Sequence, residues 1–148
     1  MYVVRHAEKN TSDSIGKMMA NDPPLSEAGK VRALVLKNEL AGKQIGHIYS
    51  TNTIRTRSTA EPLSQAIKIN VELYGSIDSL ISTIKSGKGN VLVVGHSNTV
   101  DDIVNKLCGQ VKIASDLKDG EYDNLFIVKF RGKKIIFDQR KYGYPSNP

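Results

Sequence analysis

The chain has 148 residues, of which 39% are hydrophobic, which suits one domain with a buried core and excludes a disordered protein. Lysine and arginine exceed aspartate and glutamate by 21 − 15 = 6, which favours anionic partners in general. Aromatic residues do not interleave with the basic ones, and no apolar run could span a membrane, so neither nucleic acid nor a membrane is expected as a partner. The single cysteine, Cys108, excludes an intrachain disulfide and a cysteine-based metal site.

The first elements alternate between strand and helix. Residues 2–4 form a short apolar run, which is typical of a buried strand. The polar segment 10–24 ends in two prolines and is predicted to be a loop, with at most a short helical turn. A helix follows, capped by Ser26 and ended near Gly42.

A second strand and a second helix come next. We expect the strand over residues 47–50 and the helix over 51–67, with Pro62 interrupting the helix or marking its boundary. Residues 69–75 are predicted to be extended. A third helix over 76–89 starts at a serine and ends in Gly-Lys-Gly.

The last part of the chain holds the strongest strand signal. Residues 90–96 contain four consecutive apolar side chains and predict a buried strand. A fourth helix is expected over 97–109. Residues 123–141 then predict a hairpin that turns around Arg131 and Gly132.

This order of elements predicts the fold class. Repeated strand–helix–strand units favour an α/β fold, a three-layer α/β/α sandwich whose mostly parallel sheet has helices on both faces. The C-terminal β-hairpin adds antiparallel edge strands. We expect a single domain over residues 1–141 and a C-terminal tail over 142–148.

Three groups of polar residues follow predicted strands. Arg5, His6 and Glu8 follow the first strand, residues 50–55 follow the second, and His96 ends the run 90–96. Ligands of such sheets bind beyond the carboxyl ends of the strands, so we expect these groups to meet at one edge.

The residue types in these groups suit phosphoryl transfer. A histidine can act as the nucleophile, and His6 is placed for this. The transferring group spreads negative charge over its oxygens, and the planar fork of an arginine pairs with two of them, as Arg5 and Arg55 would. His96 would add a donor at the start of a helix. Each residue alone is more often structural or solvated, so the joint placement carries the prediction.

Four segments resemble the histidine phosphatase superfamily, the phosphoglycerate mutase-like fold, and occur in the family's order. They are VVRHAEK, PPLSEAGKVRA, IYSTNTIRTRSTAEPL and VLVVGHSNTV. The ending HSNT departs from the His-Asp pair of the acid phosphatase and phytase branch. The short chain is similar instead to the small, lidless phosphohistidine phosphatases.

The resemblance implies roles for individual residues. His6 would be the phosphorylated nucleophile, and Arg5, Arg55 and His96 would complete the phosphate pocket. Phosphate or sulfate is expected in that pocket, and neither a cofactor nor a metal is expected.

Three further residues are candidates for binding phosphate or substrate. Glu8 would orient the loop and its basic side chains, or it is a solvated carboxylate. Ser97 or Asn98 would donate at the start of the fourth helix, although Asn98 is equally suited to being only a helix cap.

The general acid that protonates the leaving oxygen is open. Glu72 and Asp78 are the candidates after the third strand, and Asp13 or Asp22 could come from the first loop. None lies in a recognised motif. By the resemblance, short members lack the usual acid, which suits a good leaving group such as that of phosphohistidine or another phosphoramidate.

The favoured function is a phosphatase acting on a phosphorylated small molecule or a phosphoprotein. A phosphoglycerate mutase is one alternative, but mutases of the family carry a covering insertion, for which residues 73–91 are too short. A non-catalytic phosphate-binding module is another, and the presence of His6 argues against it. The substrate, the oligomeric state and the compartment stay open; no signal peptide is visible, so cytoplasm is the default beside an exported mature form.

Overall fold

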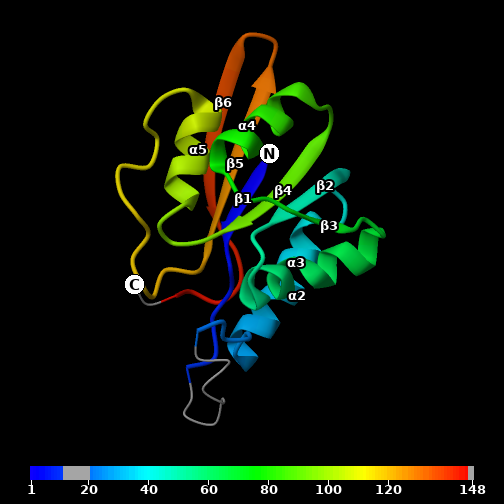
Figure 1. Cartoon of the computed structure of the whole chain (residues 1–148), viewed down its shortest axis with the longest axis vertical. Coiled ribbons are helices and arrows are strands. Elements are labelled where there is room, and N and C mark those ends of the chain that lie inside the picture. The colour runs from blue at the N-terminus through cyan, green and yellow to red at the C-terminus, as the bar shows by residue number, and fades with distance from the viewer. Residues whose placement is uncertain (12–20, 147–148) are drawn as a thin grey trace.

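The structure is a computed structural model and describes residues 1–11 and 21–146 (Figure 1). Most of the predicted loop 10–24, including Asp13, lies outside the described residues. The elements of the described residues, in chain order, are β1 Tyr2–Arg5, α2 Glu27–Leu40, β2 Ile45–Ser50, α3 Ile54–Ile67, β3 Val71–Leu73, α4 Ile77–Ser86, β4 Asn90–Gly95, α5 Val100–Cys108, β5 Asn124–Arg131 and β6 Lys134–Lys141.

The six described strands form one sheet in the order β3-β2-β4-β1-β5-β6. β3, β2, β4 and β1 run parallel, and the hairpin β5–β6 is antiparallel to β1. The predicted α/β fold with a C-terminal hairpin is therefore confirmed. Figure 1 shows this long hairpin reaching the top of the view.

Helices cover both faces of the sheet because the central strands are apolar on both sides. Val91 and Val93 of β4 belong to one buried cluster, and Leu92 and Val94 to the other, as expected for side chains that alternate along a strand. α4 and α5 pack in the first cluster, and α2 and α3 in the second. The two helix pairs lie apart in Figure 1, which makes the three predicted layers.

Short polar side chains start the helices as the sequence predicts. Ser26 Oγ accepts a hydrogen bond from Gly29 N at 3.1 Å, and Ser76 caps α4 in the same way. No helix of the described residues is long and apolar enough to cross a membrane.

The expectation that Pro62 interrupts or bounds its helix is wrong. α3 continues through Pro62 to Ile67 and ends at Lys68, which has a left-handed backbone with φ 59°. Ala60 and Leu63, on either side of the proline, are fully buried in the core. Their packing offsets the hydrogen bond that the proline cannot donate.

The segment after β6 packs against the domain. Tyr142 is buried with 3% of its surface exposed, and its carbonyl oxygen accepts a hydrogen bond from Arg32 Nη1 at 2.7 Å. The division into a domain of residues 1–141 and a tail stays a prediction.

Candidate active site

The topology brings the predicted site together at the carboxyl ends of three adjacent strands. β1 and β4 are neighbours in register, with Arg5 opposite Gly95, and His6 N donates to Gly95 O at 2.9 Å. The ring centroids of His6 and His96 are 5.5 Å apart. Arg55 lies in the first turn of α3, directly after β2.

His6 is held as a neutral imidazole with a defined tautomer. Its Nδ1 lies 2.7 Å from the carbonyl oxygen of Ala7, which can only accept, so Nδ1 carries the hydrogen and Nε2 carries the lone pair. Burial, and then the charges of Arg5 and Arg55, lower the pKa of His6 from 6.5 to about 3, although the Ala7 hydrogen bond opposes this. Nε2 is therefore an unprotonated nitrogen at neutral pH.

Arg5 is fixed by a loop that precedes β5. Its Nη1 donates to the carbonyl oxygens of Lys118, Asp119 and Glu121 at 3.1, 2.9 and 2.9 Å. Its guanidinium lies over the ring of Tyr122, 4.0 Å from the centroid. The Nε of Arg5 is buried and has no hydrogen-bond partner among the described residues, so it can still donate.

Arg55 has a similar free donor and a carboxylate beside it. Its Nε is also buried without a partner among residues 1–11 and 21–146. Asp22 Oδ1 accepts from Ile54 N at 2.9 Å and lies 3.6 Å from Arg55 Nη1. Asp22 thus lies at this site, and its contacts suit orienting Arg55.

His96 is tied to the end of β2. Its Nε2 lies 2.7 Å from Thr51 Oγ1, and its backbone N–H donates to Thr99 Oγ1 at 2.9 Å. Burial, followed by the charges of Arg55 and Arg5, lowers the pKa of His96 below 6.5.

Glu8, in the loop after β1, pairs with Arg32 of α2. Its Oε1 accepts from Arg32 Nε at 2.7 Å and its Oε2 from Arg32 Nη2 at 3.3 Å. The same guanidinium donates to the carbonyl oxygens of Tyr142 and Tyr144, each at 2.7 Å. This arrangement favours the predicted orienting role of Glu8 over that of a solvated carboxylate.

Ser97 and Asn98 lie before the fourth helix. α5 begins at Val100 with Thr99 at its N-cap, so the predicted start at residue 97 and the cap role of Asn98 are wrong. The Thr99 side chain bonds the backbone of His96, which keeps residues 96–99 in a turn. Asn98 is exposed and Ser97 is half-buried, and their proposed contact with phosphate stays a prediction.

The structure does not bring Glu72 and Asp78 to this site. Glu72, on the edge strand β3, lies 2.8 Å from His47 Nδ1, and both side chains are about half exposed. Asp78, on the exposed side of α4, pairs with Lys106 of α5. The geometry therefore gives no support to either as general acid.

With this geometry established, the sequence comparison identifies the family. The sequence model of the histidine phosphatase superfamily (branch 1) matches residues 1–78, more than half of the 148 residues. The chain belongs to this superfamily. Membership indicates a phosphatase, which is a hydrolase. A search of curated proteins finds no match.

Solved structures share the fold of this histidine phosphatase. The protein histidine phosphatase SixA complexed with tungstate has a TM-score of 0.71 at 17% identity, over 95% of each chain. A candidate phosphohistidine phosphatase SixA from Agrobacterium tumefaciens has a TM-score of 0.66 at 18% identity, over 97% of this chain and 96% of the other. Mycobacterial glucosyl-3-phosphoglycerate phosphatase has a TM-score of 0.65 at 13% identity, over 85% and 87%.

One residue that borders the predicted site was not named from the sequence. The ring centroid of Tyr122 lies 6.0 Å from that of His6, at an interplanar angle of 59°. Tyr122 comes just before β5, and β5 runs antiparallel to β1, so its amino end lies beside the carboxyl end of β1. Tyr122 directly precedes the predicted hairpin of residues 123–141. Its place beside His6 could have been inferred only if β1 had been identified as the neighbour of the first hairpin strand.

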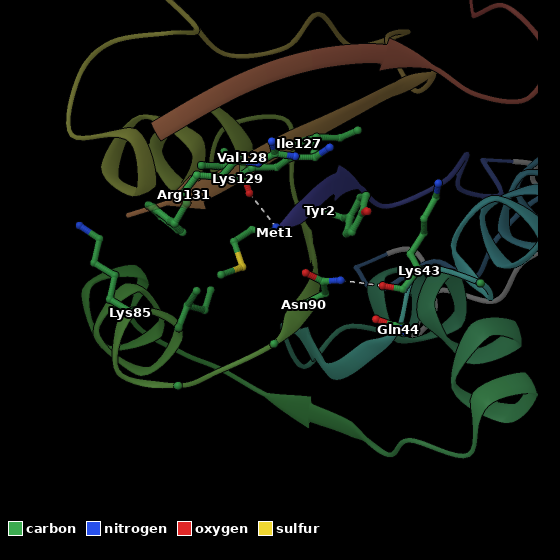
Figure 2. Close-up of a pocket in the computed structure, with 15 residues that line it drawn as sticks. Met1, Tyr2, Lys43, Gln44, Lys85, Asn90, Ile127, Val128, Lys129 and Arg131 are labelled. Carbon is green, nitrogen blue, oxygen red and sulfur yellow. Dashed lines mark hydrogen bonds between the residues drawn. The ribbon is translucent and has the colours of Figure 1, made fainter. Parts of the chain in front are cut away.

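A hollow of about 840 Å³ lies at the opposite end of the sheet (Figure 2). It is lined by Met1 and Tyr2, by Asn90 at the start of β4, and by Lys43 and Lys129. None of the predicted site residues lines it. In the described part of the chain, no group of three His, Cys, Asp or Glu side chains could hold a metal ion.

The buried histidines predict how stability depends on pH. The unfolded chain binds a proton on His6 near pH 6.5, whereas the folded chain does so only near pH 3, so the free energy of unfolding should fall as pH drops through this interval. His96 contributes in the same direction. Urea unfolding at several pH values gives the free energy of unfolding as a function of pH. The slope of this free energy against pH should be smaller in His6→Asn than in the wild type. In His47→Asn, which changes an exposed histidine, the slope should stay close to that of the wild type; an unchanged slope in His6→Asn would contradict the burial argument.

Proposed function

We propose that this chain is a metal-independent phosphatase that transfers a phosphoryl group to Nε2 of His6 and then to water. The proposal rests on one observation: the neutral imidazole of His6 lies among hydrogen-bond donors of Arg5 and Arg55 that are fixed in place. The lone pair of Nε2 is set by the bond from Nδ1 to Ala7, and the buried Nε–H groups of Arg5 and Arg55 have no partners within the described part of the chain. Such donors stabilise charge that develops on phosphoryl oxygens.

The reaction proceeds in two displacements. Nε2 of His6 attacks phosphorus, a P–N bond forms, and the bond to the leaving atom breaks with its electron pair, so the leaving group takes a proton from water. A water molecule then attacks the phosphohistidine, the P–N bond breaks, and inorganic phosphate leaves with the electron pair returned to Nε2. Arg5 and Arg55 supply the positive charge that a metal ion would provide in other phosphotransferases.

The short path after β3 supports hydrolysis rather than a mutase reaction. β3 ends at Leu73, β4 begins at Asn90, and the ten residues of α4 occupy most of the interval. A mutase must keep water from its phosphoenzyme, and this interval has no room for a covering subdomain. Bound tungstate, vanadate and phosphate in the named relatives further support a phosphate pocket here.

Good leaving groups suit this site. Glu72 and Asp78 both pair elsewhere, and Asp22 lies between Arg55 and the start of α3. The contacts of Asp22 suit orienting Arg55 rather than donating a proton to a leaving group. We therefore infer that phosphoramidates and aryl phosphates react faster than alkyl phosphates.

A substrate panel tests the function. Phosphohistidine peptides, aryl phosphates, alkyl phosphates and phosphoglycerate are compared at equal enzyme concentration, with and without EDTA. We expect phosphate release to exceed interconversion of 2- and 3-phosphoglycerate, and EDTA to have no effect. Interconversion faster than phosphate release would indicate a mutase. Binding of phosphate without hydrolysis of any substrate would indicate a binding module. Activity that is lost in EDTA and restored by a divalent ion would refute metal independence.

A further inference from the structure

Tyr122 contacts both residues of the Arg5–His6 pair. Its ring lies against the Arg5 guanidinium, 4.0 Å from Cζ to the ring centroid, and its centroid is 6.0 Å from that of His6. The ring of His96 approaches His6 at 5.5 Å. Tyr122 and His96 therefore both border the nucleophile.

The ring of Tyr122 helps to fix Arg5. Three carbonyl oxygens hold Nη1, and the ring of Tyr122 lies against the guanidinium itself. A guanidinium over an aromatic face is attracted to the ring more strongly where water is excluded, and Arg5 is only 6% exposed. The ring therefore helps to hold the guanidinium, whose Nε–H has no partner among the described residues.

The hydroxyl of Tyr122 has an unused proton. Its oxygen accepts a long hydrogen bond of 3.4 Å from Arg5 Nη2. Among the described residues no acceptor bonds the hydroxyl proton. The Nε–H of the same Arg5 guanidinium also has no partner there. A half-buried O–H beside the Arg5 guanidinium favours an anionic oxygen as its acceptor.

We propose that Tyr122 is a further residue of the active site, whose ring holds Arg5 in place and whose hydroxyl donates a hydrogen bond to the phosphoryl group of the substrate. This inference rests on the proposed function for its substrate. The Tyr122 hydroxyl would be a neutral hydrogen-bond donor beside the predicted site residues, which are Arg5, His6, Arg55 and His96.

The C-terminal segment keeps Tyr122 in this position. Tyr122 N donates to Ser146 Oγ at 3.0 Å, and Ser146 N donates to Asp123 Oδ2 at 3.2 Å. The same segment holds Arg32, the partner of Glu8, through two carbonyl oxygens. Residues 142–146 thus support both loops that border the nucleophile.

Two substitutions separate the ring from the hydroxyl. Tyr122→Phe removes only the hydroxyl and should weaken the binding of inorganic phosphate about 10- to 100-fold, the usual effect of one hydrogen bond to a charged group. Tyr122→Leu also removes the stacked ring and should weaken it further. Tyr144→Phe, in which a 77% exposed side chain loses its hydroxyl, is the matched control and should bind as the wild type does.

Inorganic phosphate affinity is measured by calorimetry, with thermal unfolding and aryl phosphate turnover measured on the same samples. The melting temperature of Tyr122→Phe should match that of the wild type, which excludes a general loss of structure. Wild-type affinity in Tyr122→Phe, or no phosphate binding by the wild type, would overturn the hydroxyl's role. Equal losses in Tyr122→Phe and Tyr122→Leu would overturn the role of the ring. A wild type that binds phosphate through Tyr122 but hydrolyses no substrate would instead refute the proposed function.

Discussion

Replacement of His6 by alanine is expected to abolish both turnover and the covalent phosphoenzyme. Brief incubation of the wild type with labelled substrate should leave phosphate on the protein that is stable in base and lost in acid. The His6→Ala protein should retain no such label. Removing the nucleophile of a covalent enzyme can lower kcat by up to about 10⁶-fold, so residual turnover should be near the detection limit.

The physical reason lies in the environment of this one ring. His6 is 4% exposed, its Nδ1–H is committed to Ala7, and its pKa is lowered to about 3, chiefly by burial. A neutral imidazole already carries the attacking lone pair and needs no base to activate it. Removal of the ring therefore removes the nucleophile itself. His96 approaches His6 but its Nε2 is engaged by Thr51 Oγ1.

The control for this experiment is His47→Ala. His47 is about half exposed on β2 and pairs with Glu72, so its loss should change neither labelling nor turnover. Label that persists in His6→Ala would assign the phosphoryl group to another residue. The His6→Ala protein should still unfold cooperatively. This distinguishes the loss of the nucleophile from the loss of the fold.

The elements of the fold could be predicted because each has a local signal. Apolar runs such as residues 91–94 specify buried strands, and serines such as Ser26 and Ser76 specify helix starts. Parallel strands joined by helices bring their carboxyl ends to one edge, so the proximity of His6 and His96 also followed.

The parts that could not be predicted depend on contacts between distant segments. Arg5 is separated by 113 to 117 residues from its four partners in the loop before β5. The pairing of Glu8 with Arg32 needs the C-terminal segment as a third participant. The start of α5 was misplaced because Ser97 and Asn98 suit a helix cap, whereas Thr99 occupies that position and bonds His96. The contacts of Arg5 and of Arg32 depend on distant segments, which local sequence does not encode, whereas the start of α5 depends on a choice among three neighbouring polar residues.

Replacement of Arg55 by alanine is expected to lower turnover about 100- to 1,000-fold, the usual cost of losing one fixed donor to a developing charge. Its side chain is 20% exposed, and its buried Nε–H has no partner among the described residues. A donor of this kind is available to a bound anion. The loss should therefore appear in kcat as well as in phosphate affinity.

Arg55→Lys should not restore the activity, because an ammonium group on a flexible stem cannot reproduce a planar fork. The fork of Arg55 is oriented by Asp22, 3.6 Å from its Nη1, and that carboxylate is itself fixed by the backbone of Ile54. A lysine at this position would pair with Asp22 and turn its charge away from the phosphoryl group. The matched control is Arg57→Ala on the exposed side of the same helix, which should keep near-wild-type turnover. Steady-state kinetics of the three variants with an aryl phosphate test this prediction. A near-normal kcat in Arg55→Ala would show that Arg55 is not part of the pocket. Full activity in Arg55→Lys would show that the reaction requires the charge of Arg55 rather than its planar fork.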